Sequence, residues 1–96
     1  MKEQDLIPAD VICVQYKVER WFVNALGESG IIEIIKQQET EYIHCDHLAQ
    51  FEKMMRLHRD LQINMEGLEA INHLLNKVEE LQKDNRRLKN RLDLYE

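Results

Sequence analysis

A repeat of seven residues runs through the last third of the chain, with mostly apolar side chains at its first and fourth positions. A single helix cannot bury the stripe that these positions form, so the repeat predicts a coiled coil with a second helix. We therefore expect residues 65–96 to form a long helix through which two copies of the chain dimerise. We call the stripe the seam, and its predicted dimer contacts are Ile71, Leu74, Val78, Leu81, Asn85, Leu88 and Leu92.

Two alternatives would also cover the seam. The helix could fold back onto its own head, or it could pair with a different protein and make the chain a structural adaptor. Leu68 and Leu75 lie off the seam, and we expect both to turn toward the head. Asn85 stands at a first position, where an asparagine commonly fixes the register of a parallel two-stranded coil.

Residues 1–64 remain for a globular head, which is close to the smallest size at which a hydrophobic core is stable without help. One proline and three glycines leave little room for linkers. The two cysteines do not form a framework of the secreted kind, and no apolar run approaches the length of a membrane span. Charged residues interrupt any signal-like start. We therefore expect a cytoplasmic protein without a membrane partner.

The apolar spacing of the head predicts a mainly helical fold with one β-hairpin. The expected helices span residues 8–14, 19–28 and 46–61, and the expected strands span residues 31–36 and 40–43. Pro8 suits a first helical turn, and Gly30 suits the end of the second helix. Asp46 is expected to cap the third helix, and Asn64 is expected to cap the long C-terminal helix.

The head is acidic. Residues 1–45 hold four basic and eight acidic side chains, a net charge of −4, and the whole chain carries −5. DNA phosphates attract basic surfaces, so this balance favours a basic protein partner over nucleic acid. Trp21 is the only tryptophan, and it is either a core residue or an exposed binding residue. The predicted partner-binding residues, which we call the acidic face, are Glu19, Trp21, Glu28, Glu33, Glu39 and Glu41.

The sequence shows no nucleophile with a paired base, no glycine-rich phosphate loop and no recognisable pair of carboxylates. We therefore expect neither an enzyme nor a cofactor. His44, Cys45 and His47 lie together in the sequence, but a structural zinc site takes four well-spaced ligands. We expect these side chains to diverge at a junction between strand and helix, and to serve capping and packing. Cys13 is expected to be a small core residue.

The expected order of two helices, a hairpin, a helix and a long helix is that of a winged helix-turn-helix with a dimerising tail. Residues 16–32, with the sequence YKVERWFVNALGESGII, resemble the second helix and exit of the MerR family. MerR-type DNA binders usually carry arginines on this helix to hold phosphates. The matching positions here hold Trp21 and Asn24, and Arg20 remains nearby with Glu19 beside it. The resemblance thus implies the fold of a DNA-binding protein without the basic residues that hold phosphates.

Within this superfamily the chain is similar to the chaperone modulators of the CbpM type. The matching stretches are residues 38–43, 55–61, 64–71 and 85–92. In that family the modulator inhibits a DnaJ/CbpA-like co-chaperone by binding its J-domain, whose chaperone-facing surface is positively charged. The resemblance thus implies an inhibitor that uses the acidic face. The alternative is a MerR-family DNA-binding transcriptional regulator. MerR relatives pair their tails antiparallel, which conflicts with Asn85, so the orientation stays open.

Overall fold

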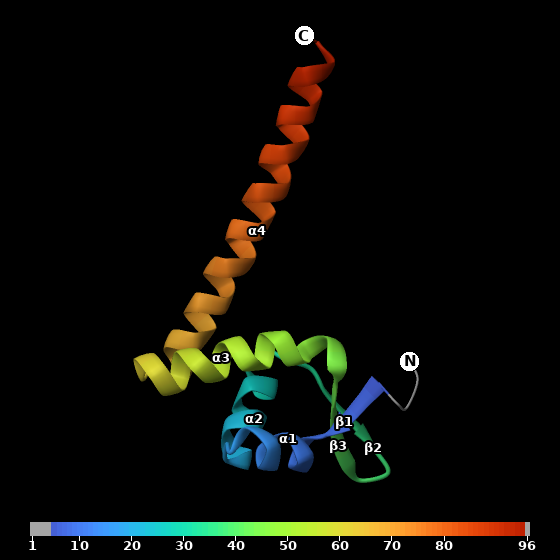
Figure 1. Cartoon of the computed structure of the whole chain (residues 1–96), viewed down its shortest axis with the longest axis vertical. Coiled ribbons are helices and arrows are strands. Elements are labelled where there is room, and N and C mark those ends of the chain that lie inside the picture. The colour runs from blue at the N-terminus through green and yellow to red at the C-terminus, as the bar shows by residue number, and fades with distance from the viewer. Residues whose placement is uncertain (1–4, 96) are drawn as a thin grey trace.

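The computed structural model describes residues 5–95, and it is built as a small head from which one long helix projects (Figure 1). The elements are β1 (Leu6–Pro8), α1 (Ala9–Tyr16), α2 (Arg20–Glu28), β2 (Ile34–Gln37), β3 (Thr40–His44), the 3-10 helix η2 (Cys45–His47), α3 (Leu48–Leu61) and α4 (Met65–Leu94). The molecule measures 56 × 35 × 20 Å along its principal axes. The predicted mainly helical fold with a small β-hairpin and a long C-terminal helix is confirmed.

Helices α1 and α2 form the helix-turn-helix. Pro8 precedes α1 as its cap, and Lys17 ends it in the left-handed conformation with φ of 56°. Arg59 of α3 donates to the carbonyl oxygens of Tyr16 (3.0 Å) and Lys17 (3.2 Å), which satisfies the end of α1. Gly30 follows α2 with φ of 79°, a conformation that glycine adopts without strain. The two predicted helices are confirmed to within two residues at each end.

The wing is the hairpin of β2 and β3, and it closes through a two-residue turn. Gln38 and Glu39 both have positive φ, at 48° and 65°, which is the backbone of the turns that match strand twist. The predicted hairpin is confirmed, but β2 begins only at Ile34. Ile31 and Ile32 are buried at 6% and 2% exposure, so they fill the core between α2 and the wing rather than extending the strand.

The third strand, β1, was not predicted. It pairs antiparallel with the other edge of β3, with Leu6 opposite His44 and Pro8 opposite Tyr42, which gives the sheet order β1-β3-β2. Pro8 lacks an N–H but lies in an edge strand, where a missing donor is tolerated. The helix begins at Ala9, one residue after the expected start, because Pro8 belongs to β1 and serves as the N-cap of α1.

The start of α3 also differs from the prediction. The side chain of His44 accepts a hydrogen bond from the backbone N–H of Asp46 (3.1 Å) and caps η2. Asp46 lies inside this 3-10 turn, and α3 begins at Leu48 with His47 before it. The prediction that Asp46 caps α3 is therefore wrong, because the extra turn takes up the residues between strand and helix.

The core lies among α1, α2, α3 and the wing, and it takes one residue from α4. The buried apolar residues are Ala9, Ile12, Phe22, Val23, Leu26, Ile31, Ile32, Ile43, Phe51, Met54 and Leu68. Leu68 is fully buried, as predicted, whereas Leu75 is 36% exposed and the prediction for it is wrong. Helix α4 crosses α3 near its own start and then leads away from the head (Figure 1), and its side chains are exposed from His73 onward within the described residues.

Replacing Asn64 with alanine is expected to lower the free energy of unfolding by about 1 kcal/mol. As predicted, Asn64 caps α4: its side-chain oxygen accepts from the backbone N–H of Gly67 at 2.9 Å. The loss would fray the turn that carries Leu68 into the core. Thermal unfolding by circular dichroism should show the midpoint lowered by about 4–8 °C. The variant Asn64→Asp keeps an acceptor and should stay near the wild type; an equal drop in both would show that the cap is not the cause.

Candidate partner-binding site

The exposed side of α2 and the wing is organised around Arg20, the one basic residue of α2. Its guanidinium binds Asp10 of α1 at 2.5 Å, Glu41 of β3, and the side-chain oxygen of Asn24 at 3.2 Å. Two carboxylates from different elements therefore hold the single arginine of this helix. An arginine held in this way is poorly placed to bind a phosphate.

The structure gathers part of the acidic face and spreads the rest. Glu28, at the end of α2, and Glu41 of β3 line one shallow pocket of about 310 Å³ together with Lys36. Glu33 is exposed in the segment before β2, and Glu39 lies in the turn of the wing. The face thus runs from α2 along the wing rather than forming one cluster.

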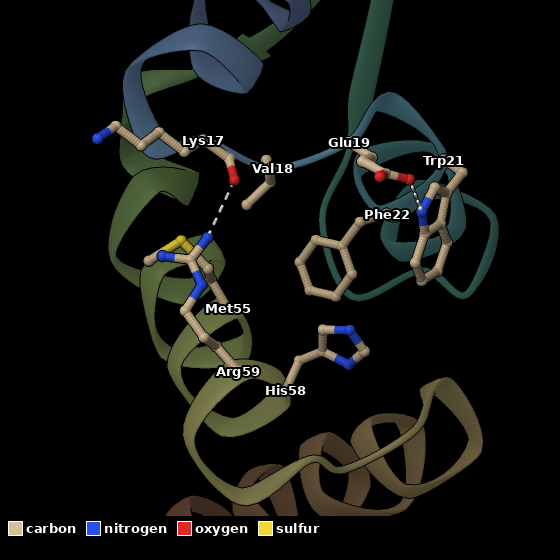
Figure 2. Close-up of a pocket in the computed structure, with 8 residues that line it drawn as sticks. All are labelled: Lys17, Val18, Glu19, Trp21, Phe22, Met55, His58 and Arg59. Carbon is tan, nitrogen blue, oxygen red and sulfur yellow. Dashed lines mark hydrogen bonds between the residues drawn. The ribbon is translucent and has the colours of Figure 1, made fainter.

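A groove lies between the start of α2 and the end of α3, with a volume of about 260 Å³. Figure 2 shows Trp21 and Glu19 on one wall, Arg59 and Lys17 on the other, and the His58 ring below Phe22. The residues that line this groove are Lys17, Val18, Glu19, Trp21, Phe22, Met55, His58 and Arg59. Two members of the acidic face, Glu19 and Trp21, therefore belong to the groove.

Trp21 is 53% exposed, so the alternative that it is a core residue is wrong. Its indole N–H donates to Oε2 of Glu19 at 2.6 Å. The ring stands nearly perpendicular to Phe22, at 5.9 Å between centroids, and to His58, at 6.0 Å. Perpendicular packing of this kind is favourable for aromatic rings. The ring is thus fixed on one side and open to solvent on the other.

His58 closes the groove from α3. Its Nδ1 donates to the carbonyl oxygen of Ile63 at 2.8 Å, because a carbonyl oxygen can only accept. In the neutral ring the lone pair then sits on Nε2. The ring also lies over Phe22 at 4.8 Å, tilted by 30°. Three groove residues of α3 were not predicted from the sequence: Met55, His58 and Arg59. Their spacing of three and four nonetheless places them on one side of the helix.

The seam of α4 is exposed along the described part of the tail. Leu74, Leu81 and Leu92 are each about 60% exposed. Val78, Leu81, Asn85 and Leu88 line one shallow depression on the helix, whereas Ile71 is only half-exposed near the head. Helix α4 does not fold back onto its own head, so the intramolecular alternative is wrong.

The junction between β3 and α3 brings three possible metal ligands together among the described residues. The ligand atoms of His44, Cys45 and Asp46 lie within 4.8 Å of one another. The predicted divergence of His44, Cys45 and His47 is therefore wrong for His44 and Cys45, and the 3-10 turn adds Asp46, which was not part of the predicted cluster. His47 is not part of this group, which holds fewer than the four ligands of a structural zinc site.

Cys13 lies half-buried on α1 and packs against the core. Burial raises the pKa of its thiol; Arg20 nearby lowers this pKa and Asp10 raises it. A thiol with a raised pKa stays protonated and unreactive at neutral pH. The prediction of a small core residue is therefore confirmed in part, since the side chain packs on the core without being fully buried.

These features define a winged helix-turn-helix protein with a projecting C-terminal helix. The chain matches the family described as MerR HTH family regulatory protein over residues 7–90, and it belongs to that family, which is regulatory and typically not enzymatic. A comparison with curated proteins found no match, and neither did a comparison with solved structures. Within the described residues, no helix is long and apolar enough to cross a membrane.

Proposed function

We propose that the protein is a cytoplasmic, homodimeric modulator that binds the J-domain of a DnaJ/CbpA-like co-chaperone and inhibits it. The observation that carries this proposal is the charge around α2. Where DNA-binding relatives present arginines, this chain presents Trp21 and Asn24, and its Arg20 is held by Asp10 and Glu41. The remaining carboxylates give the head an acidic surface that suits a basic protein.

The inhibition would be competitive. A J-domain stimulates its chaperone through a basic surface, and an acidic head bound there would cover it. Long-range attraction between the two surfaces raises the association rate and selects the partner, while apolar contacts at the centre supply most of the holding energy. The exposed ring of Trp21 beside these carboxylates has the composition of such a centre.

Calorimetric titration against a J-domain tests the proposal, with a DNA duplex titrated in parallel at the same salt concentration. Heat with the J-domain and none with DNA would support it. A second assay should show that the protein lowers the stimulation of the chaperone's ATP hydrolysis by the co-chaperone. Binding to DNA alone would overturn the proposal.

The second candidate is a DNA-binding transcriptional regulator, which the family match favours. It requires affinity for a duplex that falls steeply as salt rises, because each neutralised phosphate releases counterions. The described residues of α2 and the wing offer Arg20 and Lys36 as basic groups, and Arg20 is engaged by carboxylates. This arrangement is why we place DNA binding second.

Reversing three carboxylates of the acidic face, Glu28, Glu33 and Glu39, to lysine is expected to slow association with the J-domain about 10-fold at low salt. The difference from wild type should shrink at high salt, because salt screens exposed charges. Stopped-flow kinetics would measure both effects. Glu41 is left unchanged because it binds Arg20.

The matched control reverses Glu79, Glu80 and Asp93 of α4, three exposed carboxylates that lie off the seam. It changes the net charge by the same amount, and we expect a much smaller effect on the rate. Equal slowing in both variants would mean that total charge, rather than the acidic face, governs the encounter.

A further inference from the structure

We propose that the groove between α2 and α3 receives one arginine or lysine side chain from the J-domain, stacked on Trp21 and paired with Glu19. This inference rests on the proposed function and assigns it a specific contact. The groove's volume of about 260 Å³ lies below that of pockets for drug-sized ligands, which start near ~300 Å³. A space of this size suits a single long side chain.

The aromatic wall favours a cation. The indole N–H of Trp21 is already bonded to Glu19, so the part of this ring still open to a ligand is its π-face. Phe22 and His58 hold the ring from one side through perpendicular contacts. A tryptophan face is the most favourable aromatic surface for an ammonium or guanidinium group.

The carboxylate of Glu19 lies at the same wall. Its Oε2 accepts from the indole, while Oε1 makes no hydrogen bond with the residues that the structure describes. A guanidinium stacked on Trp21 would lie within reach of this oxygen, and an ion pair beside a stacked ring is stronger than either contact alone. The indole bond also fixes the carboxylate, which lowers the entropy lost on binding.

The two cations that line the groove do not occupy this position. Arg59 donates to the carbonyl oxygens of Tyr16 and Lys17 at the end of α1, where the helix dipole favours positive charge. Figure 2 shows the amine of Lys17 pointing away from Trp21, and Arg59 on the opposite wall. The groove is therefore polarised, and an incoming cation is favoured at the wall of Trp21 and Glu19.

The floor suits the apolar stem of such a side chain. Figure 2 shows Val18 and Phe22 between the two walls and Met55 beside Arg59, and all three line the groove. The methylene groups of arginine and lysine commonly pack on apolar surface while the charged head reaches a polar partner. The arrangement thus provides for both parts of one basic side chain.

Trp21 reports on the groove directly, because it is the only tryptophan of the chain. The full-length protein is titrated with a J-domain that lacks tryptophan, and the emission of Trp21 is followed together with calorimetric heat. We expect the emission to change in parallel with the heat. The variant Glu19→Gln keeps an acceptor for the indole and removes the charge, and it should raise the dissociation constant about fivefold or more.

The variant Trp21→Leu keeps apolar surface without a π-face and should weaken binding to a similar degree, measured by calorimetry. Glu79→Gln of α4 removes the same charge at an exposed position off the seam and away from the groove, and it should change the dissociation constant less than twofold. Thermal midpoints of all three should match the wild type, which separates a lost contact from a lost fold.

Two outcomes overturn the inference, and they differ. If the J-domain binds while Trp21 emission stays constant and both groove variants bind like the wild type, the groove is not the contact and the proposed function stands. If the J-domain gives no heat with the wild-type protein, the proposed function fails, and this assignment of the groove fails with it.

Discussion

The variant Phe51→Ala is expected to lose about 3–5 kcal/mol of unfolding free energy, which for a small domain is a large part of the total. Phe51 is fully buried in α3. Its ring packs edge-on against Tyr16 of α1, at 5.3 Å between centroids, and Phe22 of α2, at 6.2 Å. One side chain therefore joins the three helices of the head, and its removal leaves a cavity that none of them can fill alone.

Urea unfolding followed by circular dichroism would measure this loss, at one fixed protein concentration because association contributes to apparent stability. Phe51→Leu fills part of the space and should cost about 1–2 kcal/mol. Leu61→Ala, at a position that is 65% exposed, should stay within about 0.5 kcal/mol of wild type. A loss below about 1 kcal/mol in Phe51→Ala would show that the head does not depend on this junction.

The core and the groove are linked through Phe22. This ring contacts Phe51 on the core side and both Trp21 and His58 on the groove side. Any repacking around Phe51 therefore moves the support of Trp21. If the proposed partner binds at the groove, stability and binding are coupled in this head, because the same aromatic rings serve both.

The elements that the sequence predicted best are those with local causes. The helical spacing of apolar residues located α3 and α4, and Asn64 caps α4 as expected. The elements that were not predicted from the sequence depend on contacts with residues far away along the chain. Strand β1 has three residues and exists because β3 offers it an edge. Ile31 and Ile32 have the β-branched side chains that are typical of a strand, but both are buried in the core between α2 and the wing.

The candidate site was only partly predictable for the same reason. Glu19 and Trp21 are close in sequence, and their hydrogen bond could be anticipated from local spacing. Arg20 binds Asp10 and Glu41, which lie 10 and 21 residues away in the sequence. A count of charges along the sequence cannot show that these two carboxylates share one arginine. His58 enters the groove through the crossing of α2 and α3. No local pattern reveals which side of α3 faces α2.

The contacts of Arg20 show how α2 differs from a DNA-binding helix. On a DNA-binding helix a residue such as Arg20 would extend toward a phosphate. Here the same side chain links α1, α2 and the wing through two carboxylates. The engagement of Arg20 by two carboxylates is one reason for our proposal that this surface binds another protein rather than DNA.

The variant Leu81→Asp is expected to raise the dissociation constant of the proposed homodimer about 100-fold or more, which corresponds to about 3 kcal/mol. Leu81 lies at the middle of the seam and is 60% exposed in the single chain. It borders the depression that Val78, Asn85 and Leu88 also line. A carboxylate there would have to be buried against the partner helix without a counter-charge, in addition to the loss of apolar contact.

Sedimentation equilibrium over a range of concentrations would measure the effect against the chain mass of 11.5 kDa. Asn90→Asp adds the same charge at an exposed position off the seam, and it should remain as dimeric as the wild type. If both variants dissociate alike, added charge rather than the seam is responsible. If the wild type itself sediments as a monomer at all concentrations, self-pairing is overturned. The exposed leucines of α4 would then require a helix from a different protein, which favours the adaptor, because a stripe of this length is not left in water by a helix that works alone.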